Sequence, residues 1–95
     1  MTAEHERLLT LVRPLRAIGW VFLPTTLAAP TTRRTVDALF GLRTHDDMED
    51  NIQVWEHWAT ASRLRKTGGH EIQLWHSAGR AERIVEELLT LPLSH

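Results

Sequence analysis

A chain of 95 residues, 42% hydrophobic and 24% charged, has the composition of one globular domain, which excludes disorder along its whole length. The absence of cysteine excludes disulfides, iron–sulfur clusters and thiolate zinc sites. Because 11 Lys and Arg residues oppose 12 Asp and Glu residues, the formal net charge is −1, so any contact with DNA must come from local basic patches.

The N-terminal segment, residues 3–18, carries apolar residues at helical spacing and predicts a first helix. Pro14 lies inside this segment, and we expect it to kink the helix or to split it in two. Residues 19–24 are β-prone, whereas residues 25–32 are a Thr/Ala/Pro stretch without periodicity. This part of the chain therefore predicts a marginal strand followed by a loop.

The most apolar run covers residues 17–30, but Pro24 interrupts it and it falls short of the roughly 20 residues that a membrane-spanning helix needs. The segment ahead of it carries Glu4 and Glu6 and is itself patterned as a helix, unlike a secretion signal. We therefore expect a core segment, no membrane partner and a cytoplasmic protein.

Two more helices are predicted in the middle of the chain. Thr32 can cap a short helix that reaches Leu42, and a third helix begins near His45. The apolar stripe of the third helix, at spacings of four, three and four, consists of Met48, Ile52, Trp55 and Ala59. Alternation over residues 52–65 also permits a strand, so we expect helix to give way to strand near residue 59.

The C-terminal third predicts a β-hairpin and a last helix. Residues 61–66 and 70–76 flank a turn with Gly68 and Gly69, which supply the positive φ that tight hairpins require. Ser77 then caps a helix that ends at Pro92. The apolar stripe of this helix consists of Ala81, Ile84, Val85, Leu88 and Leu89.

This order of elements is that of a winged helix, in which a hairpin forms the wing beside a helix-turn-helix. Residues 36–42 resemble the first helix of a helix-turn-helix and its Gly-Leu turn, and the apolar residues of the third helix stand where these domains bury their second helix. Residues 74–81 resemble the exit from the wing in bacterial winged-helix regulators of the MarR, PadR and ArsR kind. The resemblance covers roughly residues 33–90 and implies a single, mainly helical α+β winged-helix domain over residues 1–95.

The resemblance also implies a homodimer, because the N-terminal and C-terminal helices pair subunits in those families. The apolar side chains that would form this surface are Leu8, Leu11, Leu15, Ile84, Leu88 and Leu91. The alternative is that the same side chains close the core of a monomer.

DNA binding and transcription regulation are the functions that the resemblance implies. The outward arc of the predicted third helix carries Asp46, Asp50, Gln53 and His57. Phosphates would repel this acidic surface. Cations flank the helix-turn-helix and lie on the first strand of the wing, at Arg33, Arg34, Arg43, Arg63, Arg65 and Lys66. We expect double-stranded DNA to be bound by these six residues with Gln53, although a solvated hairpin edge would also explain charges there.

The alternative function is a protein-interaction module or a subunit of a larger complex. Its contacts would be Asp46, Asp50 and His57 on the acidic helix, with Trp58 and Trp75 as aromatic anchors.

Motifs for chemistry are missing from the sequence. No Ser-His-Asp or Cys-His constellation and no glycine-rich phosphate loop is present. His70 and His76, six residues apart on one predicted strand, would lie about 20 Å apart and cannot share a metal ion. We therefore expect no enzymatic activity, no metal and no cofactor.

Overall fold

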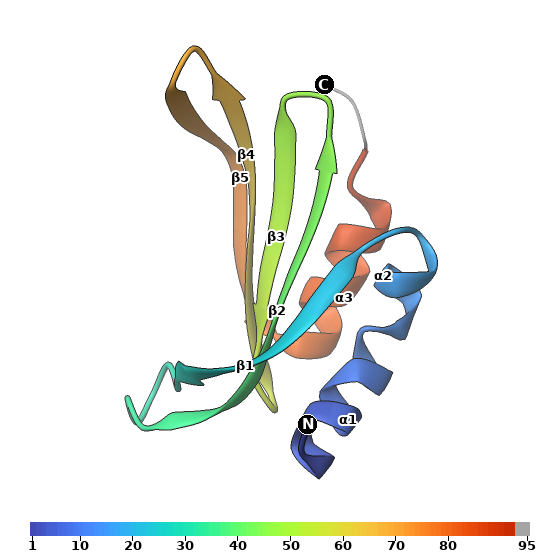
Figure 1. Ribbon diagram of the computed structural model, residues 1–95, viewed down its shortest axis with the longest axis vertical. Helices are drawn as coiled ribbons and strands as arrows, with labels where there is room; N and C mark the ends of the chain where they lie inside the picture. Colours follow the sequence, from blue (N-terminus) through green and yellow to red (C-terminus); the bar gives the residue numbers. More distant parts are fainter. Residues whose placement is uncertain (93–95) are drawn as a thin grey trace.

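The computed structural model describes residues 1–92, which form a five-stranded antiparallel sheet and three short helices (Figure 1). In chain order the elements are α1 (Ala3–Leu11), α2 (Arg13–Ala17), β1 (Val21–Ala28), β2 (Thr35–His45), β3 (Met48–Val54), β4 (Trp58–Thr67), β5 (His70–Arg80) and α3 (Ala81–Thr90). The strands neighbour one another in the order β1-β2-β3-β4-β5, so each connection is a hairpin. The last residues of the predicted domain, 93–95, lie outside the described part.

The predicted winged helix is wrong, because strands replace both helices of the expected helix-turn-helix. β2 is apolar on both faces, with Leu39 buried and Phe40 half-buried, a pattern that also fits a helix. In β3 the buried positions alternate, but one of them is Asp50. Because Asp50 occupies an inward position, apolar residues do not alternate along β3 as they do in most half-buried strands. The spacing of the apolar residues that remain favoured a helix.

Other predictions are confirmed with shifted boundaries. α1 ends at Leu11 and α2 begins at Arg13, with Pro14 in its first turn, as the sequence predicted. The hairpin of β4 and β5 turns at Gly68 and Gly69, whose φ angles are +56° and +81°. The expected loop over residues 25–32 begins later, because β1 continues to Ala28, and the last helix begins at Ala81 rather than near Ser77.

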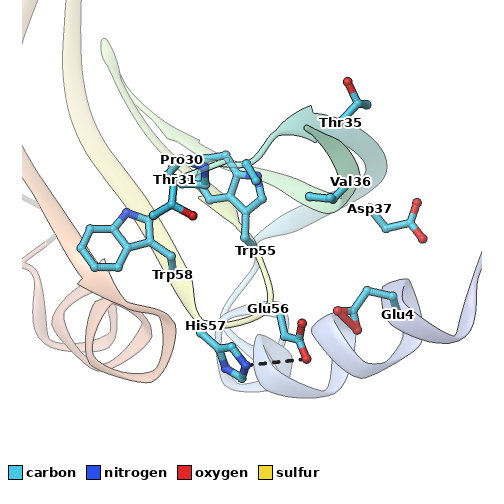
Figure 2. Close-up of a pocket in the computed structure, with 11 residues that line it drawn as sticks. Glu4, Pro30, Thr31, Thr35, Val36, Asp37, Trp55, Glu56, His57 and Trp58 are labelled. Carbon is cyan, nitrogen blue, oxygen red and sulfur yellow. Dashed lines mark ion pairs between the residues drawn. The ribbon is translucent and has the colours of Figure 1, made fainter. Parts of the chain in front are cut away.

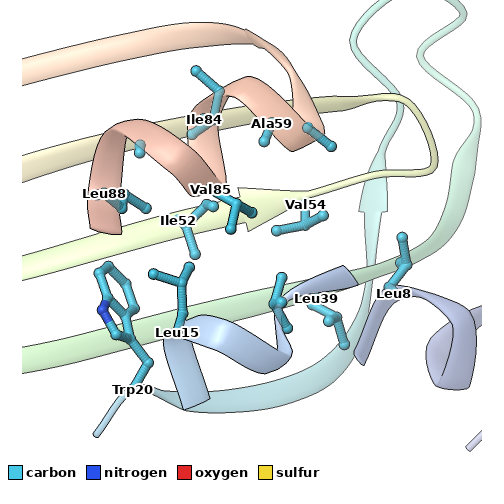
Figure 3. Packing of buried hydrophobic residues seen from close by; sticks show 13 residues of the cluster. Leu8, Leu15, Trp20, Leu39, Ile52, Val54, Ala59, Ile84, Val85 and Leu88 are labelled. Atoms are coloured by element: carbon cyan, nitrogen blue, oxygen red, sulfur yellow. The ribbon is translucent and has the colours of Figure 1, made fainter. Parts of the chain in front are cut away.

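The helices cover one face of the sheet and bury a single apolar core against it (Figure 3). Leu15 of α2 and Val85 and Leu88 of α3 lie around Ile52 of β3 (Figure 3). Of the six side chains expected at a dimer surface, four are at most 2% exposed within one chain, namely Leu8, Leu15, Ile84 and Leu88. Leu11 and Leu91 are partly buried against the same core, which favours the monomer-core alternative for this set. Within residues 1–92, no helix is long and apolar enough to cross a membrane.

A close approach of β1 to β2 depends on a glycine. Phe22 pairs in register with Gly41, and a Cβ atom at Gly41 would lie 2.3–2.9 Å from three atoms of the Phe22 ring. The Phe22 ring also stacks on Trp20, with the ring centroids 6.1 Å apart. Gly41 therefore leaves room for the Phe22 ring against β2.

Candidate functional site

A buried charge cluster lies in the row where β2, β3 and β4 align Arg43, Asp50 and Arg63. Arg63 donates from Nε to Oδ1 of Asp50 at 2.6 Å and from Nη2 to Oδ2 at 2.9 Å, and neither side chain is exposed. Arg43 donates to Oδ2 at 3.1 Å, and Nε2 of His45 lies 3.2 Å from the same oxygen. Arg63 also donates to the backbone carbonyl of Pro92.

This cluster keeps Asp50 ionised. Burial alone would raise the pKa of its carboxyl, but hydrogen bonds from Arg63 and Arg43, with the charge of Arg63 and the contact with His45, lower the pKa below the usual 3.8. Because neither Asp50 nor Arg63 reaches solvent, the structure corrects two assignments: Arg63 cannot contact a DNA phosphate and Asp50 cannot contact a partner. Arg43, another expected DNA contact, also donates to Asp50, and its guanidinium carbon lies 5.3 Å from the Trp20 ring centroid.

The cations expected on the wing are paired with neighbouring acids. Arg65 on β4 lies 3.5 Å from Asp47 in the turn between β2 and β3. Nζ of Lys66 donates to Glu49 at 3.0 Å, a contact that raises the pKa of the lysine, and lies 3.9 Å from Glu71. The acids and the cations were expected on separate surfaces. The β3–β4 pairing instead brings them together, so their charges largely cancel locally.

Three other predicted site residues are scattered. Gln53 lies on the face of the sheet opposite the core, where it accepts a hydrogen bond from Thr60 at 3.5 Å. Trp75 on β5 packs against the core cluster. Asp46 is exposed in the turn between β2 and β3, with a φ of 55°. The structure brings none of them together with His57 and Trp58.

A groove of about 730 Å³ lies where the loop between β1 and β2, the turn between β3 and β4, and the start of α1 meet (Figure 2). Its apolar lining includes Val36 of β2 and two tryptophans, Trp55 and Trp58, on either side of the turn. Trp55 is 8% exposed and Trp58 41% exposed. The buried ring thus supports the site, while the Trp58 ring is free to contact a ligand.

The tight turn between β3 and β4 positions the two tryptophans. The backbone N–H of Trp55 donates to the carbonyl of Trp58 at 2.8 Å, which leaves only Glu56 and His57 at the tip. Glu56 points toward α1, and His57 Nε2 lies 3.6 Å from its Oε1 (Figure 2). A two-residue turn therefore carries an acid and an imidazole and is flanked along the chain by the two tryptophans.

Carboxylates dominate the charge of the groove. Glu4 of α1 and Glu56 both contact Arg7, whose Nη1 lies 3.5 Å from Glu56 Oε1. The third carboxylate, Asp37 of β2, has no guanidinium partner within residues 1–92. Three carboxylates against one guanidinium give the groove a formal charge of −2 when its histidines are neutral.

Asp37 is held in place by the N-terminus of α1. It accepts a hydrogen bond from the hydroxyl of Thr2 at 2.8 Å, and His5 Nε2 lies 3.8 Å from its other oxygen. Thr2 also caps α1, because its hydroxyl accepts a hydrogen bond from the backbone N–H of His5 at 3.1 Å. The carboxylate is 30% exposed and can still bind a cation.

A free pair of arginines adjoins the groove. Arg33 and Arg34 lie exposed in the loop between β1 and β2 and form no ion pair with any carboxylate of residues 1–92. The same loop contributes Pro30 and Thr31 to the wall of the groove, but the arginines themselves do not line it.

The sequence identified only part of this site. His57 and Trp58 were assigned to a protein interface and do lie together in the groove, whereas Glu4, Asp37 and Glu56 were missed. These residues lie together because α1 and β2 both reach the turn between β3 and β4. No sequence pattern predicted that arrangement. The one available signal was the string of residues 55–58, Trp-Glu-His-Trp, between two alternating stretches.

Comparisons with protein-family models, with the sequences of curated proteins and with solved structures find no match to this chain. Among residues 1–92, no three His, Asp or Glu side chains are grouped to hold a metal ion. Function is therefore inferred from the geometry and chemistry of the groove.

Proposed function

We propose that this protein is an interaction module that binds an arginine-containing segment of a partner protein in the groove beside Trp58. The observation that carries the proposal is an exposed tryptophan ring in a groove that Glu56 and Asp37 also line and that has excess negative charge. An aromatic face attracts a cation, and a carboxylate beside it binds the same cation through charge-assisted hydrogen bonds.

Arginine suits this site better than lysine. Its planar guanidinium can stack on an exposed ring such as that of Trp58, and it can donate two parallel hydrogen bonds to a carboxylate such as Glu56. Val36, which is 39% exposed, gives an adjoining apolar side chain of the partner a surface to cover. The volume of about 730 Å³ matches sites that hold a few side chains. A short partner segment with arginine beside an apolar residue fits these properties.

Titration with a short arginine–leucine peptide tests the proposal directly, with ¹⁵N-resolved indole signals as the readout. A control peptide carries citrulline, which keeps the shape of arginine and removes its charge. The arginine peptide should shift the Trp58 indole signal, and the citrulline peptide should bind at least threefold more weakly, as expected for losing about 0.7 kcal/mol or more of cation binding. Equal binding of both peptides would exclude the proposed recognition of a cation.

Groove variants extend the test. Trp58→Ala and Glu56→Gln should each weaken the arginine peptide about two- to fivefold. Glu71→Gln is the matched control, because it removes the same charge from β5, outside the groove. An unchanged affinity in both groove variants would locate the peptide elsewhere.

DNA binding stays a prediction, without the winged helix on which it depended. Of its expected contacts, Arg33 and Arg34 are exposed, and the side chains of Arg65 and Lys66 are 37% and 51% exposed. Fluorescence anisotropy of a labelled duplex at low and moderate salt distinguishes the two functions. Salt-sensitive binding that disappears in Arg33→Ala with Arg34→Ala would favour DNA over a basic protein segment.

A further inference from the structure

The loop between β1 and β2 holds Arg33 in an uncommon conformation. Its φ is 61°, in the left-handed region where glycine is at ease and a long side chain costs conformational energy. Arg33 N–H donates to the carbonyl of Ala29 at 3.0 Å, and Ala29 N–H donates to the carbonyl of Arg34 at 2.8 Å. These bonds close the backbone of the loop, and the two arginines at its tip are exposed.

The charge of this tip complements the groove beside it. Arg33 and Arg34 contribute +2 and have no carboxylate partner within residues 1–92, and the groove carries −2 from three carboxylates and Arg7. The arginines do not line the groove of their own chain, although Pro30 and Thr31 of the same loop do. Each chain thus presents an exposed cationic tip beside an anionic groove that tryptophans line in part.

We infer that two copies of this chain associate by exchanging these tips, with Arg33 and Arg34 of each copy bound in the groove of the other. The inference rests on the proposed function, because it assigns the arginine-bearing segment to a second copy. A two-fold axis beside the loop lets both contacts form at once, since a twofold interface uses the same patch on both partners. Trp58, Glu56 and Asp37 receive the partner's arginines.

Sedimentation equilibrium over a range of chain concentrations and at two salt concentrations measures this association. The wild-type chain should dimerise, and added salt should weaken the dimer. Arg33→Glu with Arg34→Glu should weaken dimerisation more than tenfold, and so should Glu56→Lys, which replaces a carboxylate that is 52% exposed. The control Arg13→Glu with Arg16→Glu changes the net charge by the same amount on exposed positions of α2 and should dimerise like the wild type.

A mixture of the two interface variants gives the sharpest result. In the Arg33→Glu/Arg34→Glu homodimer, like charges meet at both contacts. In the Glu56→Lys homodimer, the arginines meet grooves whose formal charge has changed from −2 to 0. In the mixed dimer, the reversed, acidic tip of one chain meets the ammonium group that Glu56→Lys introduces in the other, while the native arginines meet the native groove. We therefore expect a 1:1 mixture of Arg33→Glu/Arg34→Glu with Glu56→Lys to form a heterodimer more tightly than either variant forms a homodimer.

The outcomes separate the two proposals. A wild-type chain that stays monomeric, or a tip variant that dimerises as well as the control, overturns the exchange of tips. If such a chain still binds the arginine peptide, the proposed function stands without it. Dimerisation that depends on the tip, in a chain that does not distinguish arginine from citrulline peptides, supports the exchange and overturns recognition of an external segment. Circular dichroism of each variant verifies that the sheet is retained.

Discussion

Arg63 on β4 and Asp50 on β3 face each other in register, and the guanidinium holds both carboxylate oxygens without any exposure to solvent. A buried ion pair gains stability from its attraction but loses the hydration of two charges, so its net contribution can be small. Removing one partner is different, because it leaves the other charge buried with less compensation. The cost of substituting Asp50 or Arg63 should therefore depend on whether the other residue is substituted as well.

Replacing Arg63 with methionine should lower the free energy of unfolding by about 3–5 kcal/mol, because Asp50 then loses its two shortest hydrogen bonds. Asp50→Leu should cost a similar amount, since Arg43 and Arg63 would face each other without a counter-charge. The double variant Asp50→Leu with Arg63→Met should be more stable than either single one. Urea unfolding measures all three.

The exposed pair of Lys66 and Glu49 provides the control for this experiment. Its nitrogen and oxygen atoms are 3.0 Å apart, but water screens the pair. Lys66→Met should therefore leave the urea midpoint nearly unchanged. If Arg63→Met lowers the free energy of unfolding no more than Lys66→Met does, burial of the Asp50–Arg63 pair has no energetic consequence.

Acid should destabilise the protein partly through Asp50. Its pKa in the folded state lies below 3.8, the value expected in the unfolded chain, so its contribution to stability is present above that pH and is lost as the pH falls through the lower, folded value. The difference in unfolding free energy between the wild type and Asp50→Asn should therefore narrow below about pH 4. Parallel pH profiles would contradict this role of Asp50.

Gly41→Ala should destabilise the protein by about 1–3 kcal/mol, because the new methyl group would overlap the Phe22 ring. The effect depends on that ring, so Gly41→Ala in a Phe22→Ala background should cost much less than in the wild type. Thermal or urea unfolding of the four proteins in this cycle measures the coupling. Independent, additive effects of the two substitutions would refute the predicted clash.

The hydrogen bonds of His5 assign its ring proton to Nε2. A backbone N–H can only donate, so Nδ1 accepts from Thr2 N–H at 3.2 Å, and a carbonyl can only accept, so Nε2 donates to Thr25 at 2.9 Å. The ¹⁵N shifts of the imidazole report the tautomer. His57, whose side chain is 86% exposed, serves as the solvated comparison. An Nδ1-protonated His5 would mean that the contact with Thr2 is not formed in solution.

Local patterns were sufficient for the elements that carry their own signals. Pro14 marked the break between two helices, Gly68 and Gly69 marked the β4–β5 turn, and the apolar stripe of the last helix lies in the core apart from the exposed Leu89. Each of these depends on residues near one another in the chain. They are the parts of the fold that the sequence predicted correctly.

The middle of the chain depended on contacts between distant residues. Asp50 is tolerated at an inward position of β3 only because β2 and β4 bring Arg43 and Arg63 to its two sides, and no local pattern shows that compensation. The residues expected on an acidic helix lie largely on β3, and those expected on the first strand of a basic wing lie on β4. The two strands pair with each other.

The sequence by itself determined the absence of cysteine from these 95 residues, the first and last helices and one hairpin, because these follow from composition and from neighbouring residues. The tertiary structure alone decided that the middle is sheet and that Glu4, Asp37, Glu56 and Trp58 share one groove. The physical reason is that strand pairing and buried charge are stabilised by partners far along the chain, so their free energy is distributed over residues that no short window contains.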